Sequence, residues 1–187
     1  MKKLMFVLLS ILLCAALTPA AYADKTASAV NGVYVLVDPN ITLSAGAYQD
    51  AGSIQTGEIN AQVTFRVDAN EQEVEFIARV TDLWKGDDSG SEVLPIPVDE
   101  SYGVKIEATN GNPLAGGSST VVYTGEGPTV MDMPSKETEA IVIQSSQDGH
   151  FSQNVFVTAQ WNQDDPEKTI GEYSGFIELV ANLGDFL

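Results

Sequence analysis

The last seventeen residues, Gly171–Leu187, read GEYSGFIELVANLGDFL and contain the clearest β-strand signal of the chain. Apolar residues recur at every second position, while the polar Glu178 and Asn182 fall between them, which is the period of a half-buried strand. The residues of the predicted inward face are Tyr173, Gly175, Ile177, Leu179 and Ala181. This stretch therefore predicts a β-sheet core at the carboxyl end of the sequence.

The rest of the chain repeats this signal in short β-rich runs that clusters of Gly, Asn, Asp and Pro separate. No stretch of a dozen residues keeps a helical period. Seven to nine such strands predict one all-β domain, an immunoglobulin-like sandwich of two sheets. Three runs alternate most clearly, and we expect their apolar faces to form the core: Val63, Phe65 and Val67; Val74, Phe76, Ala78 and Val80; and Val155, Val157, Ala159 and Trp161.

The first 23 residues have the pattern of a cleavable signal peptide. Lys2 and Lys3 precede an apolar run, which ends at Ala21-Tyr22-Ala23. The run is short for a membrane span of roughly 20 residues. Leu13 stands where lipoprotein attachment at Cys14 needs a small residue, so we expect export with cleavage before Asp24 and no lipid anchor.

Removing residues 1–23 leaves 164 residues without cysteine, enough for one hydrophobic core that needs no disulfide. The loss of Lys2 and Lys3 takes the net charge from −17 to −19. Such a charge argues against binding nucleic acid or an anionic membrane surface.

Catalytic constellations are scarce, and we predict no enzyme, no cofactor and no catalytic or metal-binding residue. His150 lies in a turn-like DGH sequence without a second histidine or a cysteine to pair with. Two acidic clusters offer oxygen ligands for calcium, although their spacing matches no established loop and solvated surface charge is the favoured interpretation. These clusters are Asp87, Asp88 and Glu92, and Asp164, Asp165 and Glu167.

The region after the signal peptide contains a second motif. The run NGVYVLVDPNITL includes Val37-Asp38-Pro39-Asn40-Ile41-Thr42-Leu43, and Pro39 removes a backbone donor there. Together with Gly171-Glu172-Tyr173-Ser174-Gly175, this motif resembles the major subunits of colonisation-factor fimbriae, the alpha class of chaperone–usher pili. The two motifs cover about 25 residues, and the middle of the chain is similar in pattern only.

The resemblance implies a sandwich that lacks its last strand, with a hydrophobic groove beside the C-terminal strand. In that family a periplasmic chaperone fills the groove and holds the terminal carboxylate, which is that of Leu187 here. At the outer-membrane usher, the N-terminal extension of the next subunit replaces the chaperone. The resemblance thus implies a fibre of identical subunits outside the cell, with a tip adhesin as a further partner.

The same resemblance implies three regions: residues 1–23 as signal peptide, 24–37 as donor-strand extension and 38–187 as the pilin domain. The favoured inserted side chains are Ala27, Ala29, Val33, Val35 and Val37, and the other register presents Val30, Tyr34 and Leu36. Burying three valines and two alanines contributes on the order of 5–9 kcal/mol. The alternative is that Val33–Val37 is simply the first strand of a complete sandwich.

A different class of function also fits the sequence: a monomeric secreted binding module, for example for carbohydrate. Its contacts would come from loop aromatics such as Trp84, Tyr102 or Tyr123. Trp84 and Trp161 both end alternating apolar runs, so we expect both to fill the core instead.

Overall fold

The computed structural model describes residues 39–47, 49–86, 88–114 and 117–183. The chain divides between Val37 and Asp38 into two units, and every described residue belongs to the second. The predicted signal peptide, the predicted donor residues Ala27, Ala29, Val33, Val35 and Val37, and the predicted chaperone anchor Leu187 lie outside the described residues.

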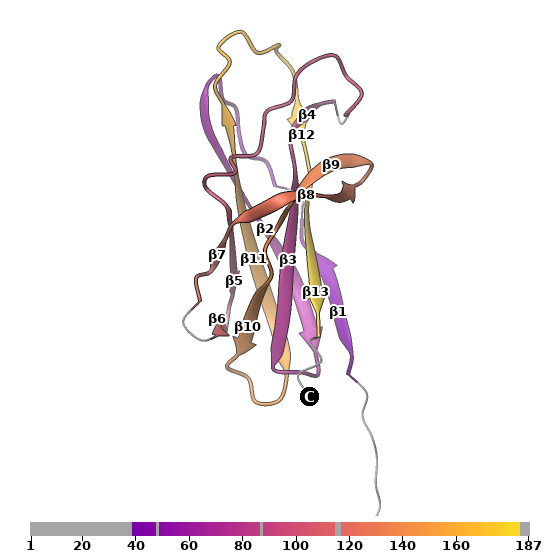
Figure 1. Cartoon of the computed structure of the whole chain (residues 1–187), viewed down its shortest axis with the longest axis vertical. Helices are drawn as coiled ribbons and strands as arrows, with labels where there is room; N and C mark the ends of the chain where they lie inside the picture. Colours follow the sequence, from indigo (N-terminus) through magenta and orange to yellow (C-terminus); the bar gives the residue numbers. More distant parts are fainter. Residues whose placement is uncertain (1–38, 48, 87, 115–116, 184–187) are drawn as a thin grey trace, which may run out of the picture. The chain divides into compact units, whose positions relative to one another are not determined.

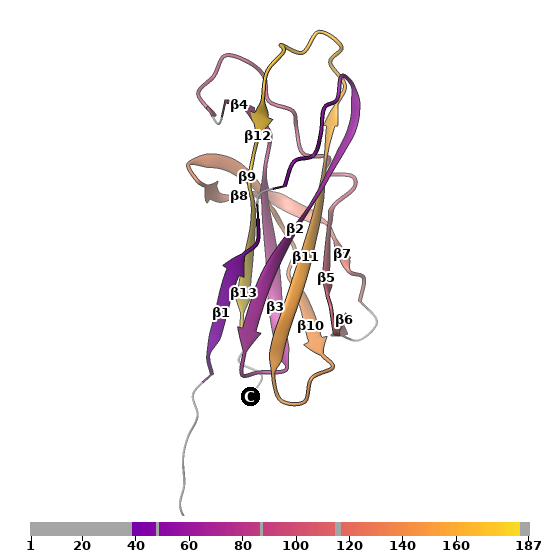
Figure 2. The same ribbon diagram turned by 180° about the vertical axis from the view of Figure 1, so that it is seen from behind.

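The described residues form an all-β sandwich, as the sequence predicts, and contain no α-helix (Figures 1 and 2). The first sheet has the strand order β1-β2-β11-β5-β7. Its strands are β1 (Ile41–Ala45), β2 (Gly57–Ala69), β11 (Phe151–Gln163), β5 (Val104–Ala108) and β7 (Thr120–Val121). The longest pairing joins β2 to β11 over thirteen residues, from Gly57 opposite Gln163 to Ala69 opposite Phe151.

The second sheet has the order β6-β10-β3-β9-β8, and β13 pairs with β3. Its strands are β6 (Gly111–Pro113), β10 (Ile141–Ser145), β3 (Glu73–Thr81), β9 (Met133–Thr138), β8 (Tyr123–Val130) and β13 (Ile177–Asn182). A further pair, β4 (Trp84–Lys85) with β12 (Tyr173–Ser174), continues the pairing of β3 with β13.

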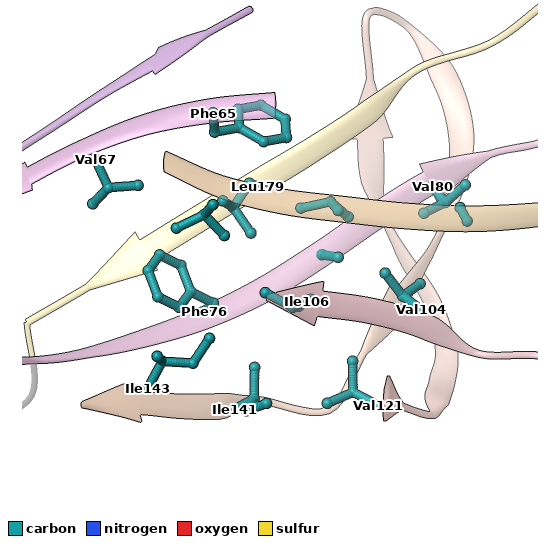
Figure 3. Close-up of a cluster of buried hydrophobic side chains, with 14 of the residues drawn as sticks. Phe65, Val67, Phe76, Val80, Val104, Ile106, Val121, Ile141, Ile143 and Leu179 are labelled. Atoms are coloured by element: carbon teal, nitrogen blue, oxygen red, sulfur yellow. The ribbon is translucent and has the colours of Figure 1, made fainter. Parts of the chain in front are cut away.

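The core lies between the two sheets and includes the predicted alternating faces except for Val63, which is only partly buried and packs against the core (Figure 3). The side chains of Val74, Phe76, Ala78 and Val80 on β3 are fully buried, as are those of Val155, Val157 and Ala159 on β11. Phe76 and Phe151 pack with their ring centroids 5.6 Å apart. Trp161 is buried as predicted, and its indole Nε1 donates to the Thr81 carbonyl at 2.8 Å.

The prediction that Trp84 fills the core is wrong. Val80 pairs with Ile177 and Trp84 pairs with Ser174, so β3–β4 contains one more residue than the opposing chain in this interval. Such a bulge reverses which side chains face inward beyond it, because side chains alternate with a period of two. Trp84 is consequently half-buried and lies outside the core cluster.

Strand order matches the immunoglobulin-like class, in which one sheet has the order ABED and the other contains C, F and G. Strands β1, β2, β11 and β5 take the places of A, B, E and D, while β3 and β13 take those of C and F. Tyr173 adds a tyrosine corner, since its hydroxyl donates to the Thr169 carbonyl at 2.8 Å just before the last strand. Among the described residues, no strand takes the place of G beside β13.

Candidate functional site: a groove between two free strand edges

A groove with a volume of about 1260 Å³ lies between the edge of the first sheet and the C-terminal strands. The buried apolar side chains at its floor include Ile59, Phe65 and Trp161 from the inward face of the first sheet. The volume exceeds the roughly 300–1,000 Å³ of common small-molecule pockets. Its size and length along β2 therefore suit a segment of polypeptide better than a small ligand.

The side chains along this groove are less buried than the remainder of the core. Ala61 and Val63 on β2, Leu83 before β4, and Tyr173 and Ile177 near β13 are only partly buried, although all pack against the core cluster. On β1, Leu43 stays 39% exposed even though it alternates in step with the half-buried Ile41. The described residues thus leave a strip of core partly uncovered where the G strand of a complete sandwich would lie.

Strand β13 contributes a free backbone edge to this strip. The Thr81 amide donates to the Phe176 carbonyl at 3.0 Å, and the pairing with β3 runs from Ile177–Val80 to Asn182–Glu75. In an antiparallel ladder, alternate residues point their N–H and C=O groups to opposite sides. Phe176, Glu178, Val180 and Asn182 therefore bond to β3, while the backbone groups of Ile177, Leu179 and Ala181 point to the other side, where no described strand pairs with β13.

Strand β1 contributes the second free edge. The Asn70 amide donates to the Asn40 carbonyl at 3.1 Å, and the Gly46 amide donates to the Thr64 carbonyl at 2.7 Å. The same alternation leaves the backbone groups of Ile41, Leu43 and Ala45 facing away from β2. Within the described part of the chain, two rows of backbone donors and acceptors without a strand partner thus border this strip, an arrangement that favours the addition of a strand.

Three of the five predicted groove residues, Tyr173, Gly175 and Ile177, line the groove. Leu179 is instead buried in the core, at 3% exposure, and Ala181 packs against the core without lining the groove. Some Cα atoms of β1 and β13 lie within 8 Å of each other. Two strands that flank a third are about 9.6 Å apart, so no further strand fits between β1 and β13 where they approach. The open part of the groove is thus the part beside β12 and the start of β13.

The sequence predicted only the side of the groove that the C-terminal strand forms, and it did not identify the remaining groove residues. The part of the groove floor on β2 comes from Ile59, Ala61 and Val63, and Ala45 lies at the end of β1. The alternation Ile41-Thr42-Leu43-Ser44-Ala45 was the signal for β1. It follows Pro39, which removes a backbone donor from the chain.

Hydrogen bonds hold the loops at one end of the groove, which we call the apex: residues 49–56, 88–97 and 164–172. Gln163 Nε2 donates to the Gln55 carbonyl at 3.2 Å, and Lys168 Nζ donates to the Leu94 and Pro95 carbonyls, also at 3.2 Å. Partial burial raises the pKa of the Tyr173 phenol, and the charge of Asp165 adds to this effect. The Tyr173 hydroxyl therefore remains a donor to Thr169.

Two of the acidic candidates hold the turns in which they lie. Asp88 accepts from the Gly90 amide and Asp165 accepts from the Glu167 amide, both at 2.9 Å, as turn-forming side chains do. Asp87 lies outside the described residues. His150 is exposed in the turn before β11, with Nδ1 2.9 Å from the Asp148 carbonyl oxygen. Within the described ranges, no group of three or more His, Cys, Asp or Glu is arranged to hold a metal ion.

The aromatic residues of the alternative binding module do not form one platform. Tyr102 is 39% exposed, but Trp84 and Tyr123 are half-buried, and neither the Trp84 Nε1 nor the Tyr123 hydroxyl has a partner among the described residues. Carbohydrate stacking needs open ring faces. The groove is thus the better developed candidate site.

Comparisons with protein families and with curated proteins identify no relative of this chain. No protein-family model matches the chain, and no curated protein matches it. Of the residues that the structure describes, none forms a helix with the length and apolar character required to cross a membrane.

Proposed function

We propose that this chain is the structural subunit of a surface fibre, a fimbria of the chaperone–usher type, in which each subunit completes the sandwich of its neighbour. The observation that carries this proposal is the core strip that the described residues leave uncovered, between the outer edges of β1 and β13 and in the place of the G strand. An exposed edge beside exposed core is an aggregation hazard unless another strand covers it. An added strand satisfies both the backbone groups and the apolar strip.

The strand that we propose as the occupant is residues 24–37 of another copy of the same chain. Its alternating Val33, Val35 and Val37 match a floor of Ile59, Ala61 and Val63 in chemical character. A donor that extends along all of β13 has to displace β1 outward, because the two strands approach too closely for a third between them. The apex part of the groove requires no such movement.

The proposal includes the partners and the location that the fimbrial resemblance implies. A periplasmic chaperone covers the groove before assembly, an usher exchanges the chaperone for the next subunit, and an adhesin occupies the fibre tip. The fibre of identical subunits supports adhesion at the cell surface. The chain has no enzymatic role and needs no cofactor in this proposal.

Polymerisation of the mature chain tests the proposal directly. Purified protein from residue 24 onward should form fibres, and an excess of a synthetic peptide of residues 24–37 should shorten them by occupying grooves. The variant Val35→Asp should fail to insert its own strand, whereas Leu36→Asp should assemble if the favoured register is right. A stable monomer that ignores the peptide would refute the fibre and favour the monomeric binding module.

A further inference from the structure

Strand β1 covers the part of the core strip that lies away from the apex. We call that end of the sandwich the base: residues 39–40, 70–72 and 146–150 (Figures 1 and 2). Ile41 pairs with Ala69 next to the base, and β1 lies beside β13 in this half of the sandwich. The groove is thus closed toward the base by a segment of the chain itself.

Burial along β2 shows the effect of β1. Val67 pairs with Leu43 of β1 and is fully buried, whereas Val63 on the same face lies beyond the end of β1 and is only partly buried. The contrast recurs on β13. Leu179 is 3% exposed although no described strand pairs with its outer side, while Ile177, nearer the apex, is partly buried and lines the groove. The strip is therefore buried where β1 is present and open where β1 has ended.

Strand β1 is attached to the sandwich less firmly than the strands around it. It pairs with β2 over five residues, whereas β2 pairs with β11 over thirteen. Four of the five β1 residues are exposed, and of the five only Ile41 packs against the core cluster. Since little apolar surface holds β1 in place, its ladder can open while the remainder of the sandwich stays folded.

The two ends of β1 differ in the direction of such an opening. Its ladder ends at Gly46, whose amide donates to the Thr64 carbonyl at 2.7 Å. A Cβ atom at Gly46 would lie 2.7 Å from the same oxygen, so glycine permits this last bond. At the base, the Asn40 carbonyl accepts from the Asn70 amide at 3.1 Å. The end at Gly46 faces the open part of the groove, and β2 is held by β11, so β1 moves aside by leaving β2 from Gly46 onward.

We infer that β1 is a lid of the groove, closed over the base half of the core strip in the unassembled chain and released when a donor strand fills that half. This inference rests on the proposed function and adds a regulation of the same site. The closed lid shields core from other chains before assembly, so that only the apex half stays open. A donor strand then enters beside β12, and its full insertion requires β1 to leave β2.

A disulfide that fastens β1 to β2 tests the lid. Ser44 pairs with Arg66, and both residues are exposed. The Cα atoms of such a hydrogen-bonded pair lie about 5.5 Å apart, which a disulfide spans. The variant Ser44→Cys, Arg66→Cys of the mature chain contains no other cysteine. When oxidised and too dilute to form fibres, it should bind a fluorescent peptide of residues 24–37 about ten times more weakly than the parent, because part of the peptide loses its contacts. Reduction should restore the affinity of the parent.

The matched control is Lys105→Cys, Thr158→Cys, which fastens β5 to β11 in the same sheet at residues that do not line the groove. Its oxidation should leave peptide binding unchanged. Equal affinities of the oxidised and reduced lid variant would overturn the lid while leaving the fibre intact. Failure of the parent both to bind the peptide and to form fibres would instead refute the proposed function and, with it, this inference.

Hydrogen exchange gives an independent reading. In the free parent, the amides of Thr42, Ser44 and Gly46, which face β2, should exchange at least about ten times faster than the amides that join β2 to β11. Equal rates for the two sets would contradict a lid that opens in the folded chain. Gly46→Ala disturbs the last bond of β1 and should speed both this exchange and peptide binding. Gly90→Ala, whose Cβ would approach only the Asp88 carboxylate, should change neither.

Discussion

The amide of Phe176 donates to the side-chain Oγ1 of Thr81 at 2.8 Å, at a position where an antiparallel ladder would use the Thr81 carbonyl. That carbonyl accepts from the indole of Trp161 at 2.8 Å instead. Thr81 is fully buried and also donates its own amide to the Phe176 carbonyl. One threonine therefore joins the start of the C-terminal strand to β3 and to the core tryptophan of the opposite sheet.

Replacing Thr81 with valine keeps the shape of the side chain but removes the acceptor of the Phe176 amide. We expect Thr81→Val to lower the free energy of unfolding by about 1–3 kcal/mol, the cost of an unsatisfied buried donor. Thr81→Ser retains the hydroxyl and should lose less. Denaturant unfolding of both variants measures the difference, and equal losses would show that this hydrogen bond contributes nothing.

Gly175 occupies a position between β12 and β13 where a side chain does not fit. A Cβ atom there would lie 2.7 Å from the Asp82 carbonyl oxygen and 2.7 Å from Thr81 Oγ1. Gly175→Ala should therefore force the backbone apart, at a cost of roughly 1–3 kcal/mol. Gly90→Ala is the control, because its Cβ would approach only the flexible carboxylate of Asp88. Equal melting temperatures for the two variants would contradict the close approach.

Neighbouring positions on β13 separate folding from groove binding. Leu179→Asp places a carboxylate in the core and should cost roughly 3–5 kcal/mol of folding free energy. Ile177→Asp alters a half-buried groove residue, so it should reduce fibre formation more than stability. The control Glu178→Gln removes only the partly exposed ion pair with Arg79, worth about 1 kcal/mol at most. Normal fibres from folded Ile177→Asp would exclude the groove as the donor site.

The alternation of apolar and polar residues correctly predicted which side chains of β3 and β11 face the core. The faces of β3 and β11 were correct because every second side chain is apolar there, and the resulting burial is nearly complete. The hairpin of β8 and β9 was missed, since YTGEGPTV has glycine or proline where a strand usually places apolar residues. Its turn also uses Met131 and Asp132 at positive φ, 50° and 63°, without a glycine as a signal.

The groove was predictable only on the side that carries the C-terminal motif. Val63 and Ile177 are more than a hundred residues apart in sequence, and only the strand order brings both to the same groove. Trp84 shows a second limit, because the bulge after Val80 reverses the inward face, so that Leu83 instead of Trp84 packs against the core. Non-local strand pairing determines the position of the groove, and a single-residue bulge determines the burial of Trp84. The period of the sequence predicts neither.

The terminal carboxylate offers a test of the proposed chaperone. If the chaperone holds the carboxylate of Leu187, a short charged tag after this residue should lower the amount of subunit recovered with its chaperone and reduce surface fibres. A tag at the amino end of the mature chain, before Asp24, lengthens the chain without moving the carboxylate and serves as the comparison for recovery with the chaperone. Unchanged recovery of the carboxyl-tagged subunit would show that the carboxylate is not an anchor.

The carboxyl group of Asp82 should make stability depend on pH in a predictable direction. Burial raises its pKa above the ordinary value, and Glu126 and Glu100 add to this, although the Val98 amide donates to its Oδ1 at 2.9 Å and Lys136 opposes the shift. A raised folded-state pKa means that the folded chain favours the protonated form. The contribution of Asp82 to stability is therefore fully present below the pKa of the unfolded chain, about 3.9, and is lost as pH rises through the folded-state pKa.

The variant Asp82→Asn isolates this effect, because the amide keeps an oxygen acceptor for Val98 and carries no charge. We expect it to be more stable than the parent at pH 7 and to lose this advantage as pH falls toward 3. Asp82→Ala is the matched comparison, since it removes the charge and the acceptor together and should gain less. Unfolding free energies measured across this pH range for all three chains provide the check. A stability difference between Asp82→Asn and the parent that stays constant with pH would show that the Asp82 carboxyl has the same pKa in the folded and unfolded chain.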